Sequence, residues 1–323
     1  MAKAIIIENT GSPSVLKFKT IKDTKPPKGM VLIKHTAIGI NFIDVYYRNG
    51  SYSLPKLPAI LGFEACGYVE EIGEGVEGIT IGERYAYATA PMGSYCDTRI
   101  IDPQYLIAVP EGISDEQASS TLFKGLTAHY LLRRTFFVKP DDKILIHAAA
   151  GGVGQLLCSW ARFLRATVIG TVGSEEKVET ALKNGCHHVI NYNTTDFAKE
   201  VNNITEGQGV AVVYDSIGKN TLLKSIECLS NFGLLVSFGQ SSGMPDPIDL
   251  SVLSPKSLFI TRPSLFNYKS DRMELILSAN EIFELLKRNI LACNINKYNF
   301  DNVIQAHQDL EERKTQGSSV LIV

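Results

Sequence analysis

The stretch "ILIHAAAGGVG", residues 144–154, decides the fold expected for this chain. An aliphatic run passes into three alanines and then into the closely spaced glycines Gly151, Gly152 and Gly154. Glycine costs conformational entropy, so its use after a buried strand indicates that the backbone must come close to another group. A strand, a glycine-rich turn and a helix predict a dinucleotide-binding unit, because the helix N-terminus offers unpaired N–H groups to a pyrophosphate. The turn departs from G-x-G-x-x-G/A at its first position, where Ala149 stands.

Strand-like and helix-like segments alternate around this turn from about residue 125 onward. A helix is expected at 154–166, a strand at 167–173 and a second helix at 174–185. Further strand-like runs follow at 188–192, 210–218, 233–239 and 257–263. This alternation predicts a parallel sheet that is covered on both faces by right-handed crossovers.

The first 122 or so residues show a different pattern, in which short apolar runs are broken by Gly and Pro. Such spacing predicts a compact, mostly β unit. After Pro263 the chain turns helical over 272–289 and ends in a strand-like run, 318–323, which we expect to return to the first domain. The expected domains are 1–124, completed by 266–323, and 125–265.

Length and composition set further bounds. A chain of 323 residues suits two domains, and a net charge of -2 gives no field that would draw it to nucleic acid or to an anionic membrane. The six cysteines include no Cys-x-x-Cys pair, which argues against a disulfide framework and a structural zinc loop. Residues 144–161 carry no Asp, Glu, Lys or Arg, but their glycines, Gln155 and His147 favour a buried strand and helix over a membrane span. We expect a cytoplasmic protein.

The end of the second strand of the sheet bears on the choice of dinucleotide. An NAD site usually has Asp or Glu there to bind the ribose 2′-OH, whereas this chain has Gly173 and Ser174. A small residue leaves space for a 2′-phosphate, to which Ser174 can donate, and Lys177 lies one helical turn later. Two observations weigh against this: Glu175 and Glu176 would repel a phosphate if they turned inward, and Lys177 could be an ordinary solvated lysine. The residues favour NADP.

Ten stretches spread over the whole chain carry a family signature. They are "AIGINFIDVYYRNGSY" (37–52), "LPAILGFEACGYVEEIG" (57–73), "LFKGLTAHYLL" (122–132), "HAAAGGVG" (147–154), "GTVGSEEK" (170–177), "INY" (190–192), "VYDSIG" (213–218), "VSFGQSSG" (236–243), "TRPSLFNY" (261–268) and "TQGSSVLIV" (315–323). Through them the chain resembles the NADPH quinone oxidoreductases, zinc-free medium-chain dehydrogenases/reductases whose group includes the eye-lens zeta-crystallin.

The resemblance implies an α/β protein with a GroES-like β-rich catalytic domain and a Rossmann domain built on a doubly wound parallel sheet. It also implies a cleft for cofactor and substrate, and a homodimer formed by pairing the Rossmann sheets edge to edge. The implied NADP contacts are Asn41, Thr127, Gly152, Val153, Gly173, Ser174, Lys177, Tyr192, Ser216, Phe238, Gly239, Ser241 and Phe266. Among them, Tyr192 and Lys177 would flank the 2′-phosphate together with Ser174. Lys124 is a further candidate, either as a ribose contact or as an ordinary lysine at a helix start.

Zinc is not expected. The zinc-dependent relatives use an early Cys and a Gly-His-Glu triplet, and this chain has Asn41 and Phe63 at the matching positions. The four-cysteine lobe is also missing, since residues 85–105 contain only Cys96. Without thiolate or imidazole ligands there is no tetrahedral site.

The candidate catalytic residues are Asn41, Tyr46 and Tyr52. Hydride transfer to a quinone builds negative charge on one oxygen, so hydrogen-bond donors are wanted there. The alternatives are packing for Tyr46, a surface loop for Tyr52 and a ribose contact for Asn41. The sequence shows no Ser-His-Asp or Cys-His set. It also shows no obvious general acid, which fits a quinone better than a ketone because the hydroquinone anion can take its proton from water. We read His147 as a hydrogen-bonded core residue.

Three functions stay open at this point. The first is NADPH-dependent reduction of a quinone or other small flat electrophile, and the second is NADPH-dependent reduction of α,β-unsaturated ketones or aldehydes on the same fold. The third is NADPH binding without important turnover, as in lens crystallins, or with RNA as the partner. The mild negative charge and the lack of a basic aromatic stripe disfavour RNA.

Overall fold

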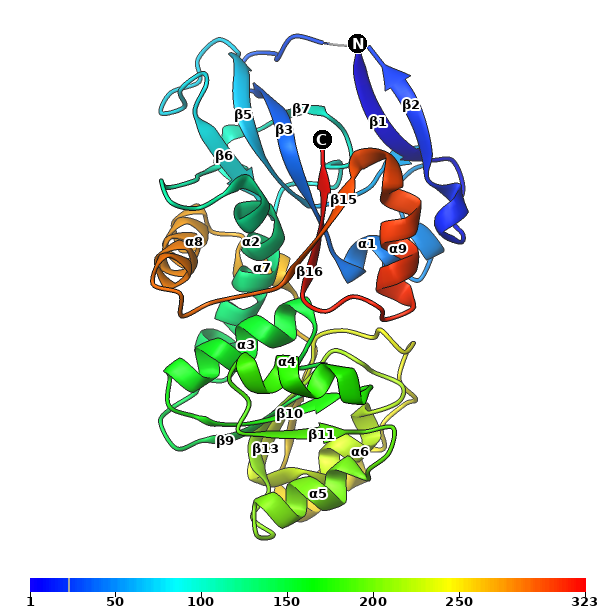
Figure 1. Cartoon of the computed structure of the whole chain (residues 1–323), viewed down its shortest axis with the longest axis vertical. Helices are drawn as coiled ribbons and strands as arrows, with labels where there is room; N and C mark the ends of the chain where they lie inside the picture. The colour runs from blue at the N-terminus through cyan, green and yellow to red at the C-terminus, as the bar shows by residue number, and fades with distance from the viewer. Residues whose placement is uncertain (23) are drawn as a thin grey trace. The chain divides into compact units, whose positions relative to one another are not determined.

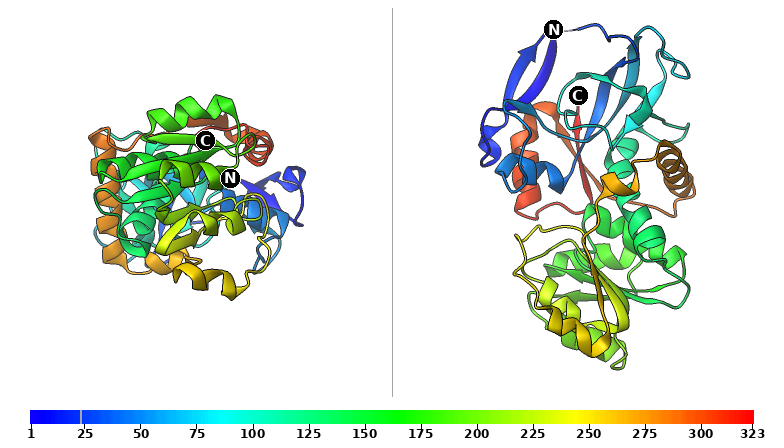
Figure 2. Two further views of the ribbon diagram at one scale, coloured as in Figure 1. Left: turned by 90° about the horizontal axis from the view of Figure 1, so that it is seen from below. Right: turned by 180° about the vertical axis from the view of Figure 1, so that it is seen from behind.

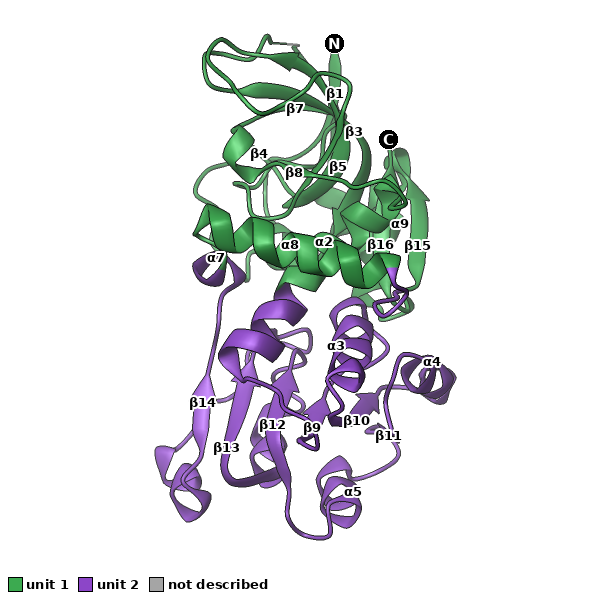
Figure 3. Cartoon of the chain, turned by 90° about the vertical axis from the view of Figure 1, so that its left-hand side faces the viewer, with its two compact units in different colours: residues 1–126, 269–287, 294–323 green, residues 127–268, 288–293 purple. Residues whose placement is uncertain are grey.

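The computed structural model describes residues 1–22 and 24–323, which form two compact units (Figure 3). The first unit comprises Met1–Leu126, Lys269–Lys287 and Asn294–Val323, so both chain termini lie in it (Figure 2). The second unit comprises Thr127–Tyr268 and Arg288–Cys293. The domain bounds expected from the sequence stay a prediction.

The first unit is built on two sheets. The larger sheet has the order β15-β16-β3-β5-β6-β8, with β7 also paired to β3, and the smaller one has the order β2-β1-β4. The bounds are β1 Ala2–Ile7, β2 Lys17–Ile21, β3 Val31–Ile40, β4 Ala59–Ile60, β5 Glu64–Ile72, β6 Arg84–Tyr87, β7 Thr98–Ile101, β8 Ile107–Ala108, β15 Ile295–Asn299 and β16 Ser318–Ile322. The C-terminal strand β16 runs antiparallel to β3, with Leu321 opposite Ile38, and thereby ties the end of the chain to the first unit (Figure 1).

Helices of the first unit flank these sheets. They are α1 Phe42–Asn49, α2 Asp115–Tyr130, α8 Arg272–Lys287 and α9 Val303–Glu311, and the last four residues of α2 belong to the second unit. Short 3-10 turns lie at Pro13–Val15, Pro103–Tyr105 and Phe300–Asn302. Helix α1 begins directly after β3 because Asn41 is its N-cap residue and Gly50, with φ +85°, ends it in the left-handed conformation. The strand that pairs with β16 thus leads straight into the helix that bears Tyr46.

The second unit contains a six-stranded parallel sheet. Its strands are β9 Lys143–Ile146, β10 Thr167–Val172, β11 His188–Asn191, β12 Val210–Asp215, β13 Leu229–Ser237 and β14 Phe259–Thr261, in the order β11-β10-β9-β12-β13-β14. Numbered along the unit, this is the order 3-2-1-4-5-6 of the Rossmann fold. Strand order reverses between β9 and β12, which is where such sheets bind ligands at the carboxyl ends of the strands. The expected Rossmann fold is confirmed.

Helices cover both faces of this sheet, with α3 and α4 on one side and α5 and α6 on the other (Figure 1). The bounds of these helices are α3 Gly152–Phe163, α4 Val178–Lys183, α5 Phe197–Ile204 and α6 Leu222–Glu227, and a short helix α7 follows at Leu265–Tyr268. The unit also has 3-10 turns at Glu175–Lys177 and Leu250–Lys256 and a π-helical turn at Leu131–Thr135. One core joins Leu145 and Val213 of the sheet to Val201 of α5 and Ile226 of α6. Among the described residues, every helix is too short or too polar to span a bilayer.

Candidate functional site

The glycine turn of the second unit brings the backbone of α3 against the end of β9. A Cβ on Gly154 would lie 2.2 Å from the carbonyl oxygen of Ala148, well inside van der Waals contact. Ala148 itself has φ +52°. The N-cap residue of α3 is Gly151, so its N-cap position has no side chain to accept from the first N–H groups of the helix. The first N–H groups of a helix have no partner within the helix, so this turn provides an anion-binding N-terminus at the point where strand order reverses.

The end of β10 brings Gly173 together with the three residues predicted to flank the 2′-phosphate. A Cβ on Gly173 would lie 2.8 Å from the hydroxyl oxygen of Tyr192, so the two residues are in close contact. Ser174 is the N-cap residue of the following 3-10 turn, and its hydroxyl makes no capping hydrogen bond. Its carbonyl accepts from the backbone N–H of Lys177 at 3.2 Å. Lys177 is half-buried, whereas Glu175 and Glu176 are exposed. The structure thus brings Gly173, Ser174, Lys177 and Tyr192 together and leaves the two glutamates in solvent.

A second group of predicted cofactor residues meets at the ends of β12 and β13. The backbone N–H of Ser241 donates to the carbonyl of Ser216 at 3.1 Å, and that of Phe238 donates to the carbonyl of Asp215 at 2.9 Å. A Cβ on Gly239 would lie 2.8 Å from the carbonyl oxygen of Ser216. The remaining predicted contacts in this unit are Thr127, buried in α2, Gly152 and Val153 in the first turn of α3, and Phe266, half-buried in α7. As cofactor contacts all of them stay predictions.

The three candidate catalytic residues lie together in the first unit. Asn41 is the N-cap of α1, and Tyr46, one turn further along, is 7% exposed. The ring of Tyr46 packs between Phe42 and Tyr52, with centroid separations of 5.2 and 5.0 Å. The backbone N–H of Tyr52 donates to the carbonyl of Tyr46 at 2.9 Å, and Tyr52 is half-buried. Tyr52 is therefore held against α1, and the catalytic roles stay predictions.

Glu64 is a buried residue of this site that the sequence analysis missed. Its side chain is fully buried; Oε2 accepts from Asn41 Nδ2 at 2.9 Å, and Oε1 accepts from the backbone N–H of Phe123 at 2.6 Å. Lys124 Nζ lies 3.7 Å from Oε2 and donates to the carbonyl of Ile40 at 3.2 Å. Burial raises the pKa of the Glu64 carboxyl, and the Lys124 ammonium opposes that rise. The signal for Glu64 in the sequence is the triplet "GFE" (62–64), in which Phe63 stands where the zinc-dependent relatives have a histidine.

The position of Lys124 contradicts one of its two predicted roles, that of an ordinary lysine at a helix start. It lies in the middle of α2 and is only 6% exposed, so it is not a solvated lysine at a helix start. Its ion pair with Glu64 crosses from α2 to the start of β5. A buried ammonium needs such a partner, because leaving one of two buried charges unpaired is costly. A ribose contact for Lys124 stays a prediction.

A second buried network lies behind α1. Asp44 Oδ2 accepts from the backbone N–H of Asn41 at 2.8 Å and from the Tyr95 hydroxyl at 3.0 Å. The Tyr95 oxygen is also 2.9 Å from His307 Nε2, and Arg48, on the same helix as Asp44, pairs with Glu311. Burial raises the pKa of Asp44 to about 7 and lowers that of His307 to about 3. The N-terminus of α1, where Asn41 lies, is thus anchored to residues from distant parts of the chain.

The raised pKa of Asp44 predicts a pH effect on stability. The folded state binds the proton more tightly than the unfolded state, whose carboxyl has a pKa near the ordinary 3.8, so stability falls as the pH rises from 3.8 to about 7. Asp44→Asn removes this fall. The difference in free energy of unfolding between Asp44→Asn and the wild type should therefore grow in favour of the variant between about pH 4 and pH 8, by up to about 4 kcal/mol. Urea unfolding across this range measures it, with the exposed Asp301→Asn as the control that should leave the pH profile unchanged.

The described part of the chain contains no cluster of side chains that could bind a metal ion. Over residues 1–22 and 24–323, no three His, Cys, Asp or Glu side chains are placed to bind one. At the positions that match zinc ligands in the metal-dependent relatives, Asn41 bonds to Glu64 and Phe63 packs on Tyr47 with a centroid separation of 5.6 Å.

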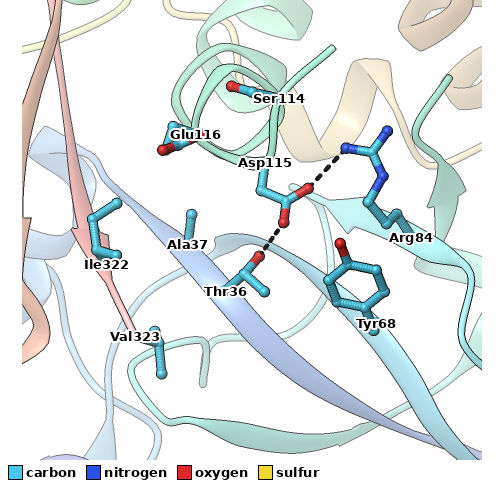
Figure 4. Close-up of a pocket in the computed structure, with 9 residues that line it drawn as sticks. All are labelled: Thr36, Ala37, Tyr68, Arg84, Ser114, Asp115, Glu116, Ile322 and Val323. Atoms are coloured by element: carbon cyan, nitrogen blue, oxygen red, sulfur yellow. Dashed lines mark hydrogen bonds and ion pairs between the residues drawn. The ribbon is translucent and has the colours of Figure 1, made fainter. Parts of the chain in front are cut away.

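A cavity of about 460 Å³ opens elsewhere in the first unit (Figure 4). Asp115 is one of its lining residues and accepts from the hydroxyl of Thr36 at 2.7 Å and from the Arg84 guanidinium at 2.9 Å. The other lining residues are Ala37, Tyr68, Ser114, Glu116, Ile322 and Val323. None of the predicted catalytic or cofactor residues lines it, so this cavity is separate from the candidate site.

Comparison with known proteins places these features in a family. Two family descriptions match the chain, "Alcohol dehydrogenase GroES-like domain" over residues 27–132 and "Zinc-binding dehydrogenase" over residues 152–279. A protein of Escherichia coli, quinone oxidoreductase 1, is 44% identical over 326 aligned residues that cover all of both chains. The chain belongs to the quinone oxidoreductase family. The resemblance seen in the sequence, including the GroES-like domain, is confirmed.

Other members of this family extend the comparison. A solved structure of the Escherichia coli quinone oxidoreductase, complexed with NADPH, has a TM-score of 0.97 and 43% identity, and covers 99% of this chain and 100% of that one. A 2-haloacrylate reductase of a Burkholderia species is also 44% identical, over all of this chain and 99% of its own. This chain is therefore equally identical, at 44%, to a quinone oxidoreductase and to a 2-haloacrylate reductase, two enzymes with different named substrates.

Proposed function

We propose that this chain is an NADPH-dependent quinone reductase that works without a metal ion. The observation that carries the proposal is the full-length relationship to the Escherichia coli quinone oxidoreductase, at 44% identity. The geometry of the second unit agrees with it, because the end of β10 offers glycine and serine beside Lys177 and Tyr192 where an NAD site would have an acid. When bound, NADPH supplies the hydride.

In this proposal the second unit binds the cofactor through backbone and small side chains. The first turn of α3 takes the pyrophosphate, because its N–H groups and the helix dipole favour an anion. Ser174, Lys177 and Tyr192 take the 2′-phosphate. The group formed by Ser216, Phe238, Gly239 and Ser241 contributes the contacts at the ends of β12 and β13.

Ser174→Asp is expected to reverse the cofactor preference. A carboxylate beside the 2′-phosphate costs several kcal/mol through like-charge repulsion, while it can bind the 2′-OH of NADH. The ratio of kcat/KM for NADPH to that for NADH should fall by about 100-fold. Ser230→Asp, at the opposite end of the sheet, is the matched control and should leave this ratio unchanged. An unchanged ratio in Ser174→Asp would remove the 2′-phosphate from this position.

The first unit supplies the groups that would meet the acceptor. We propose that Tyr46 and Tyr52 stack on a flat acceptor and that Asn41 donates a hydrogen bond where negative charge develops. Glu64 fixes the Asn41 amide by accepting one of its hydrogens, and Lys124 neutralises the buried carboxylate. The reduced acceptor can take its proton from water, so no buried acid is required.

The relationship to 2-haloacrylate reductase favours a second candidate, reduction of an activated double bond. Steady-state oxidation of NADPH with a small benzoquinone, a matched enone and 2-chloroacrylate distinguishes the two. The proposal expects the highest kcat/KM with the quinone, and a preference for either alkene would replace it. Tight binding of NADPH without turnover of any acceptor would indicate a non-catalytic role.

We further propose a cytoplasmic homodimer formed through the Rossmann sheet. Strand β14 is an edge of the sheet formed by the described residues, and large apolar side chains are exposed near it: Phe232 72%, Leu250 76%, Val252 43% and Phe259 59%. An open edge with apolar neighbours is a template for pairing with another copy. None of the six cysteines, all of which lie in the described part of the chain, forms a disulfide, which is typical of a reducing compartment. Sedimentation of the wild type and of Phe259→Lys tests the dimer, and a monomeric wild type would overturn it.

A further inference from the structure

One buried histidine links three strands of the second unit at their carboxyl ends. His147 follows β9 and is 1% exposed. Its Nδ1 lies 2.8 Å from the hydroxyl of Thr171 on β10, and its Nε2 lies 2.8 Å from the hydroxyl of Ser225 on α6. The Ser225 oxygen is 3.2 Å from Oδ2 of Asp215, the last residue of β12. Thr171, His147, Ser225 and Asp215, here called the His147 chain, are all buried.

The hydrogen bonds of the His147 chain have one direction. Asp215 Oδ1 accepts from the backbone N–H groups of Ile217 and Gly218, and its Oδ2 accepts from the Thr221 hydroxyl. The single hydrogen of the Ser225 hydroxyl goes either to Asp215 or to the Thr221 carbonyl at 2.9 Å. In both cases Ser225 accepts from His147 Nε2–H, which leaves Nδ1 to accept from Thr171. Donation therefore runs from Thr171 through His147 to Ser225, whose hydroxyl hydrogen goes on to Asp215 or to the Thr221 carbonyl.

Burial lowers the pKa of the His147 imidazole and so favours the neutral ring, against the opposing effect of the Asp215 carboxylate, whose Oδ2 lies 3.9 Å from Nε2. A neutral imidazole donates through one nitrogen and accepts through the other, so each of its two partners is specified. The ring also packs edge-on against Phe197, with a centroid separation of 5.0 Å. The histidine predicted to be a hydrogen-bonded core residue is confirmed as one, and both of its nitrogens are used.

Three members of the His147 chain lie next to segments that bear predicted cofactor contacts. His147 leads into the turn that contains Gly152 and Val153. Thr171 is two residues before Gly173 and three before Ser174, and Asp215 directly precedes Ser216. The backbone reinforces this arrangement, because the N–H of Ala149 donates to the carbonyl of Thr171 at 3.0 Å. The His147 chain thus joins the glycine turn, the end of β10 and the segment at Ser216, all three of which bear predicted cofactor contacts.

We propose that the His147 chain is a positioning device for NADPH, which holds the ends of β9, β10 and β12 in the arrangement that binds the cofactor. Its members act through the neighbouring segments and do not contact the cofactor themselves. The inference rests on the proposed NADPH-dependent function. Removing one of these hydrogen bonds leaves a buried polar atom without a partner and lets the end of a strand shift. NADPH binding must then order that strand end, which costs affinity. The acceptor step in the first unit should not depend on it.

Thr171→Val tests the proposal with a change of nearly the same shape. The dissociation constant for NADPH should rise about tenfold, the loss expected for one buried hydrogen bond, with kcat at saturating NADPH within about twofold of the wild type. Thr171→Ser keeps the hydroxyl and should restore binding. Ser225→Ala breaks the chain at another link, so the double variant Thr171→Val/Ser225→Ala should bind no worse than about the weaker single variant.

Thr205→Val is the matched control. Thr205 is equally buried in the same unit, where its hydroxyl donates to the Val201 carbonyl at 2.8 Å and accepts from the backbone N–H of Gly209 at 3.0 Å. It should lower the melting temperature as Thr171→Val does but leave NADPH binding unchanged. The proposal is overturned if Thr171→Val binds NADPH as the wild type does, or if Thr205→Val weakens binding equally. A wild type that fails to bind NADPH would instead overturn the proposed function, and the inference with it.

Discussion

Gly154→Ala is expected to weaken NADPH binding by about 100-fold or more. The added Cβ would lie 2.2 Å from the carbonyl oxygen of Ala148 and 2.9 Å from the carbonyl carbon of Ala149. Both are backbone atoms, which cannot rotate away, so α3 must move relative to the end of β9. A displacement of about 1 Å is enough to misplace the N–H groups that the pyrophosphate requires.

Titration of NADPH by its change in fluorescence measures this effect. Gly11→Ala is a suitable control, because a Cβ there meets only a methyl group of Val15 at 2.9 Å, which a side-chain rotation can relieve. The circular dichroism of Gly154→Ala should stay close to that of the wild type if the shift is confined to the turn. Undiminished NADPH affinity in a folded Gly154→Ala would show that the cofactor does not bind at this turn.

Glu64→Ala is expected to lower the free energy of unfolding by about 3–5 kcal/mol, the cost of removing one partner of a buried charge pair. The substitution takes the acceptor away from Asn41 Nδ2 and from the backbone N–H of Phe123, and it leaves the Lys124 ammonium without its carboxylate. Because Asn41 loses its anchor, kcat with a quinone should fall as well.

Urea unfolding separates the charge from the packing at this position. The double variant Glu64→Gln/Lys124→Met removes both buried charges and should be more stable than Glu64→Gln alone, because no unpaired charge remains. Glu179→Ala is the control, since Glu179 and Lys183 form an exposed pair and such pairs contribute little. If Glu64→Ala is as stable as Glu179→Ala, the Glu64 network does not support this part of the first unit.

The sequence predicted the second unit well because its signals are local. A strand, the turn at Gly151–Gly154 and a helix lie within about twenty residues, and the order of the following strands is constrained by the handedness of their crossovers. The small residues at the end of β10 could likewise be found by counting from the turn. Strand β14, inferred from a short apolar run, is present at Phe259–Thr261.

The buried networks could not be predicted because they join distant segments. Glu64 meets Asn41 and Phe123, which are 23 and 59 residues away, and Tyr95 meets His307 across 212 residues. No periodicity or spacing in the sequence connects such residues. Lys124 was ambiguous for the same reason, since its burial depends on β5 and on the carbonyl of Ile40. The His147 chain also depends on contacts between separate strands and a helix.

We propose that this chain transfers a hydride from NADPH to a quinone without a metal ion. The most direct test of this proposal is a single turnover of chelator-treated protein, loaded with one equivalent of NADPH and mixed with a small benzoquinone. We predict oxidation of all the NADPH, formation of an equal amount of hydroquinone, a rate well above that of the protein-free mixture, and no change when zinc is added. Bound NADPH that is not oxidised, or oxidation that appears only after zinc is restored, would contradict the account.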